Sequence, residues 1–393
     1  MGPTPATFRT TWSYPAQTIA GRRMKGQMNT LNLCRSCFLF CILVAVSLPG
    51  PGHAQESAAA SWTDHSGMEV DGANVHPELA DEAAGTVGIA DASQLAPAPY
   101  SIRQSRDDAW WTGPMLANSA ETLPPGHFLV EPYVYDVHSS HVDGFGSRAY
   151  MLYGLAQNLT VGFIPIVGYN RIADGRNSSG VGLGDIGVQA QYRLTEFHEG
   201  SWMPTMAIQV QETLPTGRYD QLGQRPSNGF GGGAYATTLA INSQTYFWLP
   251  NGRIVRMRFN VSKTFSNKAD VQGVSVYGTG NGFRGSARPG NAVFVDAAWE
   301  YSLTRRWVLA LDATYSHDSN TRVNGYDVVD AGSTLPLPGV RLNSGSSVAF
   351  GVAPAIEYNW TPSLGVLLGT RVILGNHSTV PTITPALALN YVH

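Results

Sequence analysis

The sequence offers few side chains that could carry out catalytic chemistry. Ser316, His317 and Asp318 have the residue types of a hydrolytic triad. A histidine activates a serine only when the two side chains lie within hydrogen-bonding reach. Successive side chains of a strand point to opposite faces, so Ser316 and His317 would not meet in that conformation. A lipid-modifying enzyme is kept as an alternative, and no catalytic residue is assigned.

Two other patterns point weakly to a bound metal or nucleotide. His138 and His141 are three residues apart, a spacing that also occurs in metal sites. Segments 182–187 and 280–285 match GxGxxG, but neither lies between a strand and a helix, as dinucleotide binding requires. We therefore expect no metal, no cofactor and no enzymatic activity.

Charged residues are more informative, because one or two of them lie on the same face of most of a series of ten-residue segments with alternating residue types. In 306–315, Trp307, Leu309 and Leu311 alternate with polar or small residues that include Asp312. A period of two is typical of a strand with two different faces. Twelve such segments follow one another: 127–136, 146–154, 159–169, 183–194, 203–214, 232–243, 253–265, 292–301, 306–316, 346–359, 363–374 and 381–391.

One face of these segments carries acids and arginines together with glutamines. Arginine forks pair with carboxylates where water is scarce, so we expect this face to line an enclosed lumen with a network of paired charges. The glutamines are Gln189, Gln191, Gln209 and Gln211. The predicted lumen charges are Glu131, Arg148, Asp185, Arg193, Arg256, Arg258, Asp296, Glu300, Asp312, Glu357 and Arg371.

Composition narrows the fold class. Charged residues make up 13% of the 393 residues, about half of what soluble domains usually contain. The formal charge of −3 gives no reason to expect nucleic acid as a partner. Non-helical chain can cross hydrocarbon only as a closed barrel, because every backbone N–H and C=O needs a partner. The sequence thus predicts an all-β, transmembrane antiparallel barrel of about twelve strands with outer-membrane lipid around it.

The connections between the segments alternate between long and short. Bacterial outer-membrane barrels have short periplasmic turns and long external loops, so both chain ends are predicted to be periplasmic. Aromatic side chains gather at the predicted periplasmic ends, where a girdle at the headgroup level is expected. They are Tyr192, Trp202, Tyr246, Phe247, Trp248, Trp299, Tyr301, Trp307, Tyr358, Trp360 and Tyr391.

The N-terminal part has the features of an export signal. Basic residues precede the apolar run 37–48, which is too short to span a bilayer, and cleavage is predicted after Ala54. All three cysteines lie between positions 34 and 41, so no disulfide is expected in the exported chain. We divide the chain into an upstream extension and signal peptide (1–54), a disordered periplasmic leader or plug (55–125) and a barrel (126–393).

Three stretches resemble a known family. PPGHFLVEPYVYD (124–136), GLGDIGVQAQYRL (182–194) and ETLPTGRYD (212–220) resemble the outer-membrane family associated with meta-pathway phenol degradation in Gram-negative bacteria. Its members are described as candidate transporters and are grouped with fatty-acid-type outer-membrane channels. The resemblance implies a barrel that passes small aromatic or apolar molecules, and it brings no catalytic motif.

The main functional hypothesis is a passive outer-membrane channel for small solutes, narrowed by the charged lumen. A plugged barrel with a structural or surface-binding role is the first alternative, in which residues 55–125 fold back into the lumen. A lipid-modifying enzyme is the second. The sequence does not specify the solute or the oligomeric state.

Overall fold

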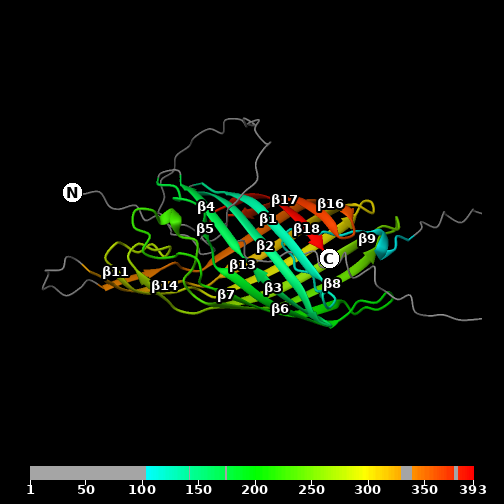
Figure 1. The fold of residues 1–393 in the computed structure, drawn as a ribbon, viewed down its shortest axis with the longest axis horizontal. Helices are drawn as coiled ribbons and strands as arrows, with labels where there is room; N and C mark the ends of the chain where they lie inside the picture. The colour runs from blue at the N-terminus through cyan, green and yellow to red at the C-terminus, as the bar shows by residue number, and fades with distance from the viewer. Residues whose placement is uncertain (1–102, 141, 173–174, 329–338, 376–378) are drawn as a thin grey trace, which may run out of the picture.

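The computed structural model describes residues 103–140, 142–172, 175–328, 339–375 and 379–393. Almost all of its regular structure is β, with two short 3₁₀-helices, η1 (Arg106–Asp108) and η2 (Pro226–Asn228). No helix within these ranges is long and apolar enough to cross a membrane. Figure 1 shows the strands running obliquely around one elongated barrel.

Twelve antiparallel strands close this barrel, which confirms the predicted fold class. β1 pairs with β2 on one side and with β18 on the other, so the sheet has no free edge. Closure gives every strand two hydrogen-bonded neighbours, as a hydrocarbon environment demands. The strands are β1 (Phe128–His138), β2 (Val142–Ala156), β3 (Leu159–Ile164) with β4 (Ile166–Ile172), β5 (Gly182–Leu183) with β6 (Ile186–Thr195), β7 (Thr205–Leu214), β8 (Ala236–Trp248), β9 (Ile254–Ser266), β12 (Ala292–Ser302), β13 (Trp307–Asp318), β16 (Ser347–Thr361), β17 (Leu364–Leu374) and β18 (Thr382–Val392).

Pro165 divides the third barrel strand into β3 and β4. Its carbonyl oxygen accepts a hydrogen bond from the Ala149 N–H at 3.2 Å, but proline has no N–H to return the second bond of this antiparallel pair to the Ala149 carbonyl. The pairing on the side away from β2 also changes at this position: β3 pairs with β6, whereas β4 pairs with the two-residue strand β5. The break leaves the wall closed, because the Gly184 N–H donates to the Ile166 carbonyl.

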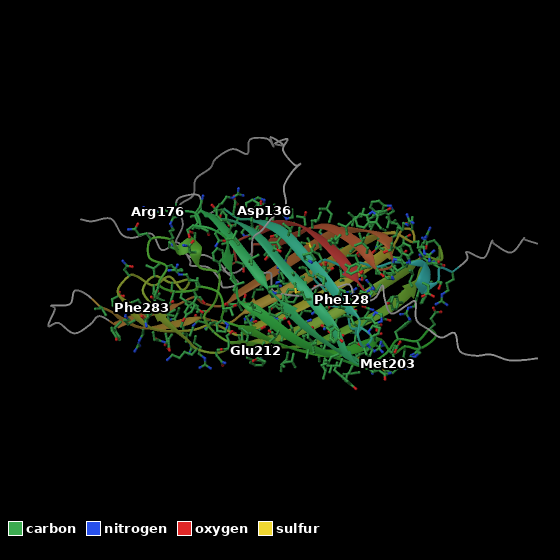
Figure 2. All side chains as sticks on the ribbon, in the orientation of Figure 1. Phe128, Asp136, Arg176, Met203, Glu212 and Phe283 are labelled. Carbon is green, nitrogen blue, oxygen red and sulfur yellow. The ribbon has the colours of Figure 1, made fainter. Side chains whose placement is uncertain are left out.

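The barrel has two unlike ends. Short connections (157–158, 196–204, 249–253, 303–306 and 362–363) lie at one, the turn end, together with the C-terminal residue His393. The other end, the loop end, has the three longest connections (215–235, 267–291 and 319–346) together with three shorter ones (139–141, 173–181 and 375–381). Figure 2 shows Phe128 and Met203 toward the turn end, and Arg176 and Phe283 toward the loop end.

Two segments expected to be loops contain a second sheet. It comprises β10 (Ala269–Gln272), β11 (Phe283–Arg288), β14 (Arg322–Asp327) and β15 (Gly339–Asn343), in that order. These strands extend β9, β12, β13 and β16 beyond the loop end (Figure 1), so the wall continues past the closed barrel. The expected loop 137–145 is likewise mostly strand, because β1 and β2 pair as far as His138 and Asp143.

Outward-facing side chains of the barrel strands are apolar and exposed, as a lipid-facing surface requires. They include Val134, Phe163, Ile208, Val210, Leu239, Ile241, Phe259, Leu309, Leu311, Phe350, Val352, Leu368, Leu387 and Leu389. Inward neighbours such as Val308, Asp312, Ala353 and Ala388 are fully buried. The alternation predicted from the sequence thus separates an apolar outside from an enclosed inside.

A charge placed on this outer surface should destabilise the barrel strongly. Leu311 is exposed and lies near the middle of β13. We expect Leu311→Arg to lower the free energy of unfolding in lipid vesicles by about 2–4 kcal/mol, and Leu303→Arg, in a turn, by at most about 1 kcal/mol. Urea titration followed by tryptophan fluorescence measures both. Equal effects would contradict a lipid-facing midsection.

Most of the predicted girdle aromatics are outward and gather at the turn end. Trp307 and Tyr358 are neighbours with ring centroids 4.6 Å apart, and Trp202 is the most exposed of the set. The others with exposed or half-exposed rings are Tyr192, Phe247, Trp299, Tyr301, Trp360 and Tyr391.

Tyr246 and Trp248 depart from the prediction, which placed them in the girdle. Both lie on the inner face of β8, because the even-numbered residues of this strand point inward. Tyr246 is buried and packs against Phe197, with ring centroids 5.3 Å apart. The Trp248 indole N–H donates to the Gln104 carbonyl at 2.8 Å. To predict which aromatic residues form a girdle, one must therefore know which face of the strand each ring occupies as well as its position along the strand.

Candidate functional site: a lumen filled from the turn end

All eleven predicted lumen charges lie on the inner face of the wall. Arg148, Asp185 and Arg193 are partly exposed. The other eight are no more than 2% exposed: Glu131, Arg256, Arg258, Asp296, Glu300, Asp312, Glu357 and Arg371.

The tightest charge cluster joins β9 to β12. Arg256 Nε and Nη2 donate to the two Glu300 oxygens at 2.6 and 2.5 Å, which is a bidentate pair. Arg258 Nε lies 3.2 Å from Glu300 Oε2. One buried carboxylate thus faces two buried arginines, and its negative charge offsets part of their mutual repulsion.

A segment preceding β1 fills the turn-end half of the lumen. Residues 109–123, here called the plug segment, are buried almost throughout. The Trp110 N–H donates to the Arg305 carbonyl at the turn end, and the Leu123 N–H donates to Thr160 Oγ1 after the segment has returned. The sequence left a leader and a plug as alternatives for 55–125. The part that the structure describes, from residue 103 onward, enters the barrel. Residues 55–102 lie outside the described residues.

Two wall carboxylates hold the plug backbone. Asp312 accepts hydrogen bonds from the N–H groups of Met115, Leu116 and Ala117 at 3.0–3.2 Å. Glu357 Oε2 accepts from the N–H groups of Thr112 and Gly113 at 2.6 and 3.1 Å. Irregular backbone in an enclosed lumen needs such partners, and charged acceptors make strong ones.

Amide side chains of the wall hold the returning half of the plug segment. Gln191 Nε2 donates to the carbonyls of Ser119 and Glu121 at 3.1 and 2.8 Å. Asn260 Nδ2 donates to the Asn118 carbonyl at 3.1 Å, and Asn118 Nδ2 donates to Gln209 Oε1 at 3.1 Å. The polar inner face therefore serves largely as a set of backbone partners.

Aromatic and basic side chains stack where the plug segment enters the barrel. The Arg256 guanidinium lies 4.6 Å from the Trp111 ring centroid, and that of Arg305 lies 4.7 Å from Trp110. Glu121, near the end of the plug segment, forms a 2.8 Å ion pair with Arg193 of β6. The segment is thus fixed by stacking as well as by hydrogen bonds.

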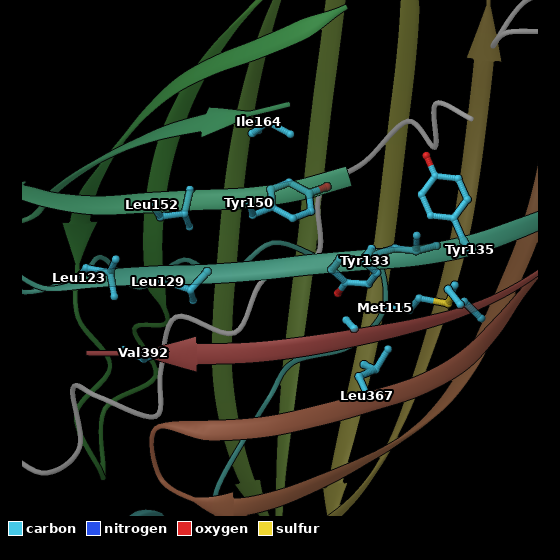
Figure 3. Packing of buried hydrophobic residues seen from close by; sticks show 14 residues of the cluster. Met115, Leu123, Leu129, Tyr133, Tyr135, Tyr150, Leu152, Ile164, Leu367 and Val392 are labelled. Atoms are coloured by element: carbon cyan, nitrogen blue, oxygen red, sulfur yellow. The ribbon is translucent and has the colours of Figure 1, made fainter. Parts of the chain in front are cut away.

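Apolar side chains of the plug segment join the core of the barrel. Met115, Leu116 and Leu123 are buried against β1 residues that include Leu129 and Tyr133. Figure 3 shows Met115 and Leu123 beside β1, together with Leu367 of β17 and Val392 of β18. The plug segment therefore packs like an interior element of the fold.

Beyond the plug segment the lumen opens into a cavity of about 230 Å³, here called the vestibule. Leu116 and Asn118 form its floor. One part of its lining is apolar and consists of Ile164, Ile166, Phe230, Phe294 and several alanines. Another part is polar: Gln209, Gln211, Thr213, Thr238, Ser262 and Thr264 are neutral, and Arg148, Asp185 and Asp318 are charged. Such a chamber suits a small molecule with an apolar body and a hydrogen-bonding group.

The loop from β7 to β8 covers part of the vestibule. Asp185 accepts hydrogen bonds from the N–H groups of Gly217 and Gly232 at 2.9 and 2.6 Å, which draws this loop inward. Phe230 is buried and sits over Gly182, where a Cβ atom would lie 2.1 Å from its ring. The predicted lumen charge Asp185 is thus a loop anchor.

His138 lies between two carboxylates at the loop end, 3.3 Å from Asp136 and 3.4 Å from Asp143. His141 lies outside the described residues. Among the described residues, no three His, Cys, Asp or Glu side chains come together as a metal-binding group.

A family model described as "Putative MetA-pathway of phenol degradation" matches residues 113–384, which include the barrel strands from β1 to β17, the start of β18 and most of the plug segment. The chain belongs to this family. The resemblance seen in the sequence is thereby confirmed. No curated protein matches the chain.

Solved structures of similar shape include channels, autotransporter domains and an attachment protein. An outer membrane channel from Pseudomonas putida F1 has 12% identity and a TM-score of 0.49, over 70% of this chain and 98% of that one. The CymD monoaromatic hydrocarbon channel has 9% identity and a TM-score of 0.31, over 69% and 88%. The Pseudomonas putida toluene transporter TodX has 12% identity and a TM-score of 0.30, over 68% and 88%.

Proposed function

We propose that this protein is an outer-membrane channel for small aromatic solutes, which cross by passive diffusion when the plug segment moves. The vestibule is the observation that carries the proposal. Its volume of about 230 Å³ exceeds the ~150 Å³ of an apolar cavity that accepts benzene, so one aromatic ring has room.

The vestibule lining favours a ring that carries a polar group. Ile166 and Phe294 can pack on a ring, while Thr213, Ser262 and Gln211 offer hydrogen-bond partners. Phenol and its derivatives have this combination, and the family description names phenol degradation. The solute class is therefore proposed to be phenol-like, with the exact compound left open.

The orientation follows from the connections. Long loops belong outside the cell and short turns in the periplasm, so the vestibule faces the exterior and the plug segment is inserted from the periplasm. His393 and the chain entering at Arg103 then lie on the periplasmic side. The apolar outer wall contacts outer-membrane lipid in this arrangement.

Planar-bilayer recording tests the channel. We expect the refolded protein to give brief conductance steps that phenol shortens as its concentration rises, because the ring occupies the vestibule. Glycerol at the same concentration serves as the control and should leave the steps unchanged. Absence of any conductance under all conditions would remove the channel proposal.

A plugged barrel with a structural or surface-binding role is the second candidate, and residues 109–123 in the lumen favour it. Lasting insertion of the plug segment would leave only the external surface to act. An enzymatic role has less support, because Ser316 and His317 are neighbours on β13 and face opposite sides of the wall. We propose that the protein is no enzyme; a His317→Ala variant that loses a measured lipid hydrolysis would contradict this.

A further inference from the structure

The second sheet, at the loop end, has one buried face and one exposed face. Val271, Phe283, Ala287 and Val323 are buried and form a small apolar core with Tyr277. Their neighbours along each strand point the other way and are exposed. The exposed face therefore carries Lys268, Arg284, Arg288, Arg322 and Arg341, with Asp270 as the one acid among its described residues.

Three of these cations lie in one row across the strands. Arg288 and Arg322 are directly opposite each other in the β11–β14 pair. Lys268 precedes Ala269, which pairs with Ala287, so it continues the row on the other side of Arg288. Like charges placed opposite each other destabilise a sheet. Among the described residues neither arginine makes an ion pair, and Lys268 has only an exposed contact of 3.8 Å with Asp270.

These cations line a cavity that adjoins the vestibule. The cavity of about 450 Å³ is bounded by Lys268, Arg288 and Arg322 together with the neutral donors Asn267, Ser286 and Asn324. Ser266 lines this cavity and also the vestibule. A small anion held at the cavity is therefore next to the chamber in which an aromatic ring has room.

We infer that Lys268, Arg288 and Arg322 form a capture site for the negatively charged group of small aromatic solutes, such as carboxylates and sulfonates. The inference deepens the proposed channel function and rests on it for the route beyond the site. Clustered charge at a channel mouth raises the local concentration and the arrival rate of oppositely charged solutes, most strongly at low salt. The shared boundary at Ser266 favours a small solute over a phosphate of the surrounding lipid as the ligand.

Calorimetry on the full-length protein in detergent tests capture directly. Benzenesulfonate, which is charged at every working pH, is the probe. We expect it to bind the wild type at low salt and to bind the R288Q/R322Q variant at least about tenfold more weakly. The R288K/R322K variant, which keeps the charges, should retain most of the binding. Arg176→Gln, an exposed cation of another loop, is the matched control and should bind like the wild type.

Uptake into proteoliposomes tests the route. Benzenesulfonate and N-methylpyridinium are aromatic ions of opposite charge that bilayers exclude, so their ratio reports charge preference alone. We expect the wild type to favour the anion and R288Q/R322Q to take up both equally. Binding without uptake would refute the channel while leaving the capture site intact. Unchanged benzenesulfonate binding in R288Q/R322Q would overturn the inference, and a loss confined to lipopolysaccharide retention would assign the arginines to lipid phosphate instead.

Discussion

A chain whose exported form starts at Pro124, and so lacks the plug segment, should show a steady conductance at least severalfold above that of the wild type. The plug segment fills the turn-end half of the lumen, and no other described element crosses it there. A twelve-stranded barrel is wider than the eight-stranded barrels that side chains alone can fill. Removal of the plug segment therefore leaves an aqueous passage. Single-channel recording in planar bilayers measures the change.

The barrel itself should survive this truncation. Its strands pair with each other around the full circle, and the plug segment adds no strand to the sheet. The wall groups that held the plug backbone, such as Asp312 and Gln191, would be hydrated in the open lumen. Heat-modifiable migration on gels verifies folding. A truncated, folded barrel with unchanged conductance would show that the constriction lies elsewhere.

A covalent lock provides the opposite control. A Cβ atom at Gly365 would lie 2.2 Å from Thr112 Oγ1 and 2.3 Å from Asn359 Oδ1, so Thr112→Cys and Gly365→Cys bring two thiols together once the Asn359 side chain turns aside. Oxidation should suppress conductance steps, and reduction should restore them. Deleting 55–102 alone should leave conductance at the wild-type level, because the plug segment remains.

The wall of this protein could be predicted from the sequence, because apolar and polar or small residues alternate along each strand with a period of two. The twelve segments and the inward charges follow from that rule alone. The second sheet could not be predicted by this rule. Its strands β10, β11, β14 and β15 are short, and the polar residues of its exposed face are also typical of a loop.

The plug segment could be given from the sequence only as an alternative to a free leader, for another reason. Residues 109–123 have no strand or helix period, and their backbone is satisfied by side chains distant in the sequence. Asp312 and Glu357 were expected to pair with arginines, but they accept main-chain N–H groups. A carboxylate's partner depends on the path of another segment, which composition and spacing do not encode. Tryptophans at 110 and 111, in a stretch otherwise lacking regular structure, were the available signal.

Glu300→Leu should be the most destabilising single substitution in the lumen. It removes the carboxylate that pairs with Arg256 at 2.5–2.6 Å and with Arg258 at 3.2 Å, and all three side chains are fully buried. Breaking a buried pair by removing one partner typically costs about 3–5 kcal/mol, because a buried charge stays behind. Urea unfolding in lipid vesicles measures the loss.

Two variants separate this effect from a general sensitivity to lost charge. Glu196→Gln removes an exposed ion pair with Arg193 at the turn end and should change stability by at most about 1 kcal/mol. Arg256→Met combined with Glu300→Leu removes both members of the tight pair and should cost clearly less than Glu300→Leu alone, since only the contact of Arg258 with Glu300 is then lost by a buried arginine. If the double variant were as unstable as the single one, the cost would arise from packing around Glu300, and the buried arginine would not be its cause.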